Sequence, residues 1–240
     1  MKRWMTTLMC AAIAAVAPQT KAQKNEGPQP RYVDPGDAGH PPSGAVLLFN
    51  GRDMSGWVAK NGKPVVCRVE SGVMACTSGV GNMYTTAKFK DAQIHLEFRE
   101  PMMPDQHGQL RGNSGVYLGG AYEIQVLDSY RNPTYATGVL GALYGQAAPL
   151  VNAARPPEHW ETYDIVYHPL ACDSAGNVTK NGTVTVLLNG VLVQDHITIR
   201  NTSGGCAAAP LMLQDHSGFK GAPVTTLRFR NIWYRPLEPR

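Results

Sequence analysis

The chain has 240 residues, 43% of them hydrophobic and 17% charged, and a formal net charge of +4. Three of its 22 basic residues lie in the first 22 positions, so the remainder carries 19 basic and 18 acidic residues and is close to neutral. This balance argues against nucleic acid or an anionic membrane surface as a partner.

Residues 1–22 have the features of a signal peptide. Lys2 and Arg3 precede a mostly apolar stretch of small residues, and residues 20–22, Thr-Lys-Ala, form an acceptable cleavage site. The apolar stretch is short and rich in alanine, and the sequence has no second one of spanning length, which argues against a membrane anchor. We therefore expect an exported protein, periplasmic or secreted.

Residues 23–43 are rich in proline, glycine and charge, which is typical of a flexible leader. The rest of the chain, residues 44–240, is long enough for one domain with a hydrophobic core. Short alternating or apolar runs in it predict strands at residues 45–49, 65–69, 73–77, 82–86, 93–99, 114–118, 121–127, 161–168, 183–188, 191–195, 210–215 and 224–234. With no long amphipathic helix, this pattern predicts an all-β sandwich or jelly roll.

Four cysteines remain after the predicted signal. A two-residue hairpin turn at residues 71–72 would bring Cys67 and Cys76 together at a non-hydrogen-bonded pair, where side chains approach most closely. We expect a Cys67–Cys76 disulfide and, by exclusion, a Cys172–Cys206 disulfide, as an oxidising compartment allows. A metal site is the weaker alternative, because no close Cys-x-x-Cys pair is present.

Three predicted strands alternate apolar residues with a polar or ionisable face. These faces are His95, Glu97 and Arg99 in the first, Glu123 and Gln125 in the second, and Met212, Gln214 and His216 in the third. A carboxylate beside an amide suits a sugar, because both bind hydroxyls and the carboxylate can also move a proton. For each face alone, simple solvent exposure is the favoured explanation, but together the three strands predict a shared polar groove.

The connection formed by residues 129–157 follows directly after the second of these strands. It combines several glycines and prolines with Tyr130, Tyr135, Leu143 and Tyr144. A connection of this length in a compact domain is usually functional or disordered, and the aromatic residues favour an ordered one. We expect it to form one wall of a pocket.

Residues 48–57, Leu-Phe-Asn-Gly-Arg-Asp-Met-Ser-Gly-Trp, resemble the opening signature of the 3-keto-disaccharide hydrolase family. Further motifs of this family follow in the same order and include residues 97–99, 112–117, 122–128, 141–145, 160–163, 188–190, 213–216 and 229–232. Any one motif is weak, but their common order makes the resemblance specific. The chain departs from the family where Trp160-Glu161 replaces the usual Trp-Asn, and in the irregular segment 204–207.

The resemblance implies a concanavalin A-like jelly roll of two curved antiparallel sheets, with the ligand on the concave sheet. It also implies cleavage of glycosides that carry a ketone at sugar carbon 3. The ketone acidifies the hydrogen at carbon 2, so one base can remove it, and the resulting enolate expels the group at carbon 1. Addition of water then decides between a hydrolase and a lyase outcome. Ordinary glycoside hydrolysis differs, because it needs two carboxylates flanking the bond.

Such a reaction needs a base, a stabiliser for the enolate oxygen and an acid for the leaving group. His216 and Glu123 are the candidate catalytic pair: a neutral imidazole suits proton removal near pH 7, and Glu123 is central in its family motif. Each also has a structural reading, His216 as a hydrogen-bonding residue at a strand end and Glu123 as a solvated carboxylate.

The candidate substrate-binding residues are Arg99, Glu97, Asn113, Ser114, Gln125, Tyr144, Gln214 and Trp160. Arg99 suits an enolate oxygen or a hydroxyl, but equally a structural ion pair with Glu97 or Glu123. Asn113 and Ser114 lie between two glycines in a tight loop, and those glycines can alternatively serve backbone geometry alone. The aromatic rings of Tyr144 and Trp160 suit stacking on a sugar, although aromatic residues are more often part of a core.

No cofactor is predicted, because no pair of histidines has metal-ligand spacing; a Ca²⁺ ion bound by carboxylates stays an alternative. The expected partner is a small oxidised sugar or glycoside. The alternative function is a non-catalytic carbohydrate-binding module on the same fold, since a fold by itself does not prove catalysis.

Overall fold

The computed structural model describes residues 29–37, 39–200 and 203–237. The predicted signal peptide and residues 23–28 of the predicted leader lie outside these ranges. The chain divides into two units, Met1–Tyr32 and Val33–Arg240, and the strands of the described residues belong to the second. None of the helices in the described ranges is long and apolar enough to cross a membrane.

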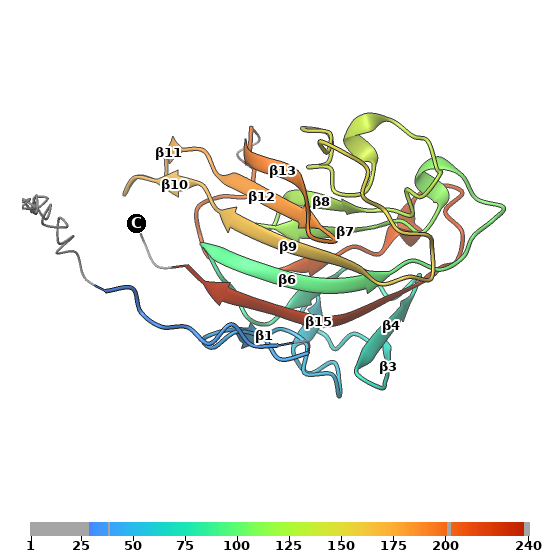
Figure 1. Cartoon of the computed structure of the whole chain (residues 1–240), viewed down its shortest axis with the longest axis horizontal. Helices are drawn as coiled ribbons and strands as arrows, with labels where there is room; N and C mark the ends of the chain where they lie inside the picture. The colour runs from blue at the N-terminus through green and yellow to red at the C-terminus, as the bar shows by residue number, and fades with distance from the viewer. Residues whose placement is uncertain (1–28, 38, 201–202, 238–240) are drawn as a thin grey trace, which may run out of the picture. The chain divides into compact units, whose positions relative to one another are not determined.

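Two antiparallel sheets form the main part of the second unit (Figure 1). The larger, eight-stranded sheet has the order β13 (Val191–Thr198), β12 (Thr183–Leu188), β9 (Glu161–His168), β6 (Ala92–Arg99), β15 (Thr226–Pro236), β4 (Val73–Thr77) and β3 (Arg68–Glu70), with β1 (Val46–Leu47) also paired to β15. The smaller, five-stranded sheet has the order β2 (Trp57–Ala59), β5 (Met83–Thr85), β14 (Met212–Leu213), β7 (Ser114–Leu118) and β8 (Tyr122–Val126). The remaining elements are a ribbon of β10 (Ala171–Cys172) and β11 (Val178–Lys180), and the 3-10 turns η1 (Gly108–Leu110), η2 (Ala136–Gly138) and η3 (His216–Gly218).

The hydrophobic core lies between the two sheets, because alternate residues of both sheets point inward. Leu96 and Phe98 of β6 and Ile124 and Val126 of β8 are fully buried and belong to one hydrophobic cluster. The other residues of each strand therefore lie on the outer faces of the two sheets. The predicted all-β jelly-roll sandwich is confirmed.

The predicted groove across three polar strands is wrong in one respect. The strand with His95, Glu97 and Arg99 is β6 of the larger sheet, whereas Glu123 is on β8 of the smaller sheet. The apolar core lies between the two sheets, so these polar groups are on opposite outer faces. Alternation shows which residues of a strand share a face, but it does not show which sheet the strand joins.

The hairpin of β3 and β4 has the predicted register, with Val69 opposite Met74. Cys67 and Cys76 form a disulfide with a Cα–Cα distance of 4.7 Å, and Cys172 and Cys206 form the second, at 5.9 Å. Both predicted pairings are confirmed.

Part of the connection 129–157 lies along the edge of β8 that faces away from β7. The Tyr144 N–H donates to the Glu123 carbonyl at 3.0 Å, the Gln125 N–H donates to the Ala142 carbonyl at 3.0 Å, and the Gly141 N–H donates to the Gln125 carbonyl at 3.1 Å. These bonds continue the smaller sheet by one irregular strand. The connection is therefore fixed to β8 by its backbone.

Candidate active site

A row of side chains crosses the outer face of the smaller sheet. The strand register places Tyr84 of β5, Met212 of β14, Tyr117 of β7 and Glu123 of β8 next to one another. An isolated bridge to the connection 129–157 adds Tyr144 on the far side of Glu123. The only carboxylate of the row therefore lies between two tyrosines.

In the next cross-strand row, the central residue is a glycine, Gly115. The Gln214 N–H donates to the Gly115 carbonyl at 2.9 Å, and Gly115 pairs with Gln125 on its other side. The Glu123 carboxylate occupies the space above Gly115, because a Cβ atom there would lie 2.3 Å from Glu123 Oε1. The position of this carboxylate thus requires glycine at residue 115.

Glu123 is a buried carboxylate with one hydrogen bond from a side chain. The Tyr117 hydroxyl donates to Glu123 Oε2 at 2.7 Å. Burial raises the pKa of Glu123 to about 7, and the hydrogen bond from Tyr117 opposes this shift only in part. A carboxyl group with a pKa near neutrality can both accept and release a proton, as general acid–base catalysis requires.

Tyr117 connects Glu123 to Gln214. The Gln214 Nε2 donates to the Tyr117 hydroxyl at 3.2 Å. Burial, and to a lesser extent the Glu123 carboxylate, raise the pKa of Tyr117 well above its usual value of 10.0, so the phenol keeps its proton. Tyr117 was not among the predicted site residues, although alternation in residues 114–118 places it on the face of Gly115.

Two amide oxygens beside Gly115 have no hydrogen-bond donor. Gln125 Nε2 donates to Gln109 Oε1 at 3.0 Å and to the Gly138 carbonyl at 3.2 Å, which fixes the orientation of the amide because a carbonyl can only accept. Gln125 Oε1 and Gln214 Oε1 are buried, and no group in the described ranges donates to them. Buried acceptors without a donor are uncommon in folded proteins. They suit a ligand that brings hydroxyl groups.

The connection 129–157 contributes two partly exposed aromatic rings at the end of the row. Tyr135 and Tyr144 are 48% and 39% exposed, and their hydroxyls are hydrogen-bonded to each other. The rings meet edge to face, with their centroids 6.1 Å apart. Aromatic rings in such a position suit contact with the apolar face of a sugar.

His216 lies beyond the end of β14, in the turn η3. Asp215 ends the strand there, because its carboxylate accepts the backbone N–H groups of Gly79, Gly81 and Ser217 at 2.7 to 2.9 Å. The strand predicted at residues 210–215 is therefore only Met212–Leu213. His216 does not belong to the alternating face on which it was predicted.

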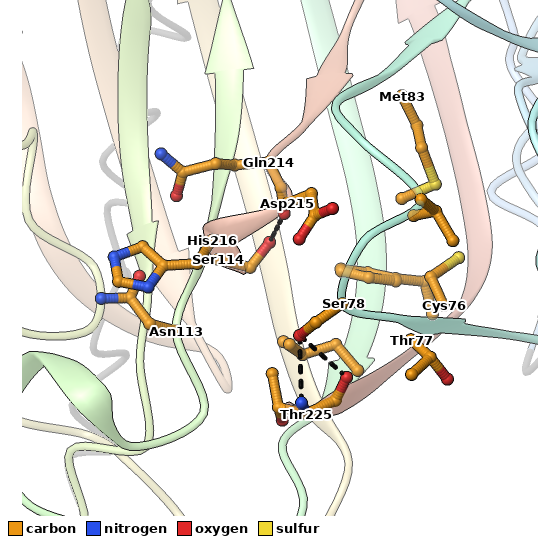
Figure 2. Close-up of a pocket in the computed structure, with 13 residues that line it drawn as sticks. Cys76, Thr77, Ser78, Met83, Asn113, Ser114, Gln214, Asp215, His216 and Thr225 are labelled. Carbon is orange, nitrogen blue, oxygen red and sulfur yellow. Dashed lines mark hydrogen bonds between the residues drawn. The ribbon is translucent and has the colours of Figure 1, made fainter. Parts of the chain in front are cut away.

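The His216 side chain lines a small cavity together with Asn113 and Gln214 (Figure 2). The cavity measures about 20 Å³, room for about one water molecule and far too little for a sugar ring. The imidazole stacks on Phe219, with the ring centroids 4.1 Å apart. Burial lowers the pKa of His216, with Asp215 opposing, so the ring is neutral at pH 7.

No hydrogen bond within the described residues joins His216 to Glu123. Gln214 connects them instead, since it lines the cavity beside His216 and donates to Tyr117, the partner of Glu123. The structure thus brings the predicted Glu123, Gln125, Gln214 and Tyr144 together, and places His216 at one end of this group.

The polar side chains of Asn113 and Ser114 are used inside the protein. Asn113 Nδ2 donates to the Gln109 carbonyl at 2.8 Å, and Ser114 Oγ donates to the Gln214 carbonyl at 2.8 Å. Both residues are buried. Ser114 is part of β7 and not of the predicted tight loop, and its hydroxyl fixes the segment that carries Gln214.

Arg99, Glu97 and Trp160 lie outside this group, on the outer face of the larger sheet. Arg230 Nε donates to Glu97 Oε2 at 2.7 Å, and the Arg230 guanidinium lies 4.0 Å from the centroid of the Trp160 ring. Arg99 lies 5.0 Å from the same ring. Glu97 and Arg99 were predicted to share a groove with Glu123, and this is wrong because β6 and β8 belong to different sheets. Trp160, predicted to stack on a sugar, lies with these two residues and not with Glu123.

His95 is the third residue of the polar face predicted for β6. Burial opposes its charged form, but the hydrogen bond to the Asp164 carboxylate and the attraction of the Glu97 carboxylate, 3.9 Å from Nε2, outweigh burial and raise the pKa of His95 to about 9. Within the described ranges, no group of three or more histidine, cysteine, aspartate or glutamate residues could hold a metal ion.

The family described as the 3-keto-alpha-glucoside-1,2-lyase-like domain matches residues 44–235. The chain belongs to this family. A crystal structure from Parabacteroides distasonis, provisionally named a glycosyl hydrolase, is 39% identical to this lyase-like chain, with a TM-score of 0.79 over 88% of this chain and 93% of the other. A second such structure from the same organism is 22% identical, with a TM-score of 0.58 over 81% and 94% of the two chains, and shows the fold alone. Among curated proteins, no match was found.

Proposed function

We propose that this lyase-like family member cleaves glycosides whose sugar carries a ketone at carbon 3, and that Glu123 is the base that removes the proton from carbon 2. The observation that carries the proposal is the setting of Glu123. It is a buried carboxylate with a pKa of about 7, seated over Gly115 and flanked by two amide oxygens that lack donors.

The number of available carboxylates supports elimination over ordinary hydrolysis. Hydrolysis needs a second carboxyl group on the other side of the bond. The nearest carboxylates along the same strands are occupied, since Asp215 accepts three backbone N–H groups and Asp128 accepts Arg111 Nε at 2.6 Å. A single base suits a substrate whose carbon 2 hydrogen is already acidified by a ketone.

In the proposed reaction, the bond from carbon 2 to hydrogen breaks and the proton moves to the Glu123 carboxylate. The electron pair forms an enolate on the oxygen at carbon 3, and the enolate then expels the oxygen substituent at carbon 1, which takes up a proton. Hydroxyl donors stabilise the enolate oxygen. The Tyr144 hydroxyl, opposite Glu123 and partly exposed, is the donor that we assign to it.

The base is assigned to Glu123 in preference to His216. The imidazole is neutral, but it lies beside a cavity too small for a sugar ring and is reached from Glu123 only through Gln214 and Tyr117. We propose that the protein acts outside the cytoplasm, which the two disulfides support because such bonds persist in oxidising compartments.

A non-catalytic sugar-binding role is the second candidate, and the Tyr135–Tyr144 pair favours it, because partly exposed aromatic rings serve binding as well as catalysis. The discriminating experiment incubates the protein with a 4-nitrophenyl 3-keto-glucoside and, in parallel, with the unoxidised glucoside. We expect release of nitrophenol from the keto form alone. Release from neither, together with sugar binding, would favour the second candidate.

The matched variants are Glu123→Gln and Glu97→Gln, which neutralise one carboxylate on each sheet. Loss of a general base costs about 10² to 10⁴ in rate, so we expect that loss in Glu123→Gln. We expect unchanged turnover per folded molecule in Glu97→Gln, with folding checked by circular dichroism. Equal losses in both variants would contradict the assignment of the base.

A further inference from the structure

Three arginines lie in one cross-strand row on the outer face of the larger sheet. The register places Arg68 of β3 opposite Ala75 of β4, Ala75 next to Arg228 of β15, and Arg228 directly opposite Arg99 of β6. Like charges directly opposite each other in a sheet are destabilising. Something must therefore offset the repulsion between Arg228 and Arg99.

The carboxylates on this face offset it only in part, through a long ion pair between Glu158 and Arg99. Arg68 pairs with Glu70 at 2.9 Å, and Arg230 pairs with Glu97 at 2.7 Å. The carboxylate nearest to Arg99 is that of Glu158, whose Oε2 is 3.9 Å from Arg99 Nε, beyond hydrogen-bond distance.

Both facing arginines also have an unsatisfied donor. Arg99 Nε and Arg228 Nη1 are buried, and neither donates a hydrogen bond to any group in the described part of the chain. Arg228 makes no ion pair with a described residue either. Buried donors on charged groups are costly when they lack an acceptor, and such groups call for an explanation.

The residues around the two arginines are small or partly exposed at this point of the row. Ala75 is small and separates Arg228 from Arg68, and the Arg99 side chain keeps 28% of its surface exposed. The Trp160 ring, 5.0 Å from the Arg99 guanidinium, borders this end of the row. Guanidinium groups bind carboxylate, sulfate and phosphate groups through paired hydrogen bonds to two oxygens, which makes an oxyanion the ligand that fits two facing arginines.

We propose that Arg99 and Arg228 form a binding site for an oxyanion, a carboxylate, sulfate or phosphate group, on the sheet face opposite the candidate active site. The ligand oxygens accept from both guanidinium groups and remove the repulsion between them. An acidic sugar and a free inorganic anion offer the same chemistry. The site is separate from Glu123, so its test does not depend on the proposed reaction.

The test measures binding to the full chain by calorimetry, with inorganic sulfate, inorganic phosphate, an oligogalacturonate and a neutral gluco-oligosaccharide as probes. The site variant is Arg228→Gln. The matched control is Arg235→Gln, which removes the same charge from β15 opposite Gln93, seven residues further along the strand.

We expect at least one anionic probe to bind the wild-type protein, with affinity that falls as salt rises and drops about tenfold or more in Arg228→Gln, the loss of one charge-assisted contact. Arg235→Gln should bind as the wild type does. Binding of the oligogalacturonate assigns the site to an acidic sugar, and binding of sulfate or phosphate alone assigns it to a free anion. No anion binding, equal losses in both variants, or equal binding of the neutral sugar would overturn the proposal.

Discussion

Each of the two sheets has a glutamate on its outer face, at an alternating position of its strand. These two residues, Glu97 and Glu123, differ in their hydrogen-bond partners. On the larger sheet, the neighbouring His95 and the hydrogen bonds from Asn231 and Arg230 lower the pKa of Glu97 to about 2, against the effect of burial. On the smaller sheet, Glu123 has one phenol as partner, and burial raises its pKa to about 7. Glu97 is thus a permanent anion that joins strands, whereas Glu123 is suited to exchange a proton. The partners of a carboxylate, and not its place in the alternation, decide its chemistry.

Gly115→Ala is the substitution expected to disturb the setting of Glu123 most, and so to reduce its difference from Glu97. The added Cβ would lie 2.3 Å from Glu123 Oε1, and the flexible carboxylate is expected to move rather than the backbone. Misplacement of a catalytic group by about 1 Å can cost about 10² in rate. We expect a loss of about that size in turnover of the keto-glucoside, with little change in melting temperature. Wild-type turnover would show that Glu123 does not need this position.

A smaller effect is expected from Tyr117→Phe, which removes the hydrogen bond that keeps the pKa of Glu123 from rising further. A base must be ionised, so the rate should rise with pH through about 7 in the wild-type protein, the pKa of Glu123. In the variant, this rise of the rate should occur at higher pH. The rate at pH 7 should fall about tenfold, as expected for loss of a hydrogen bond to a charged group. A pH–rate profile in which this rise is unshifted would argue against Glu123 as the base.

The smallest effect is on stability, from Asp164→Asn on the larger sheet. The pKa of His95 is raised from 6.5 to about 9 in the folded protein. Its contribution to the free energy of unfolding is therefore full below pH 6.5 and is lost as pH rises through 9. Asp164 is 42% exposed, so we expect the variant to lose only about 1 kcal/mol of unfolding free energy at pH 6 and nothing at pH 10. Urea denaturation at the two pH values measures this. Turnover should not change.

Local features of the fold could be predicted from the sequence because they depend on neighbours in the chain. The hairpin register follows from its two-residue turn, and Cys67–Cys76 from that register. The alternation in β8 correctly separated Ile124, which faces the core, from Glu123. Such patterns repeat every two residues and need no knowledge of the remaining chain.

The composition of the candidate site depends on pairings between distant segments. β14 lies between β5 and β7, so Met212 joins Tyr84 and Tyr117 across separations of roughly a hundred residues. No local pattern shows this order, nor that Gly115 lies beneath the Glu123 carboxylate. For the same reason the sequence could not separate the face of Glu97 from the face of Glu123.

The hydrogen bonds that fix residues 141–144 to β8 have a further consequence. β8 is the last strand of its sheet, and an uncovered edge strand is a template for pairing with other chains. The segment that carries Tyr144 therefore also caps this edge. Exchanging side chains of the segment leaves these backbone hydrogen bonds in place, but shortening it would expose the edge and favour aggregation. Diversity within the family at this position should therefore appear as substitutions and insertions more often than as deletions.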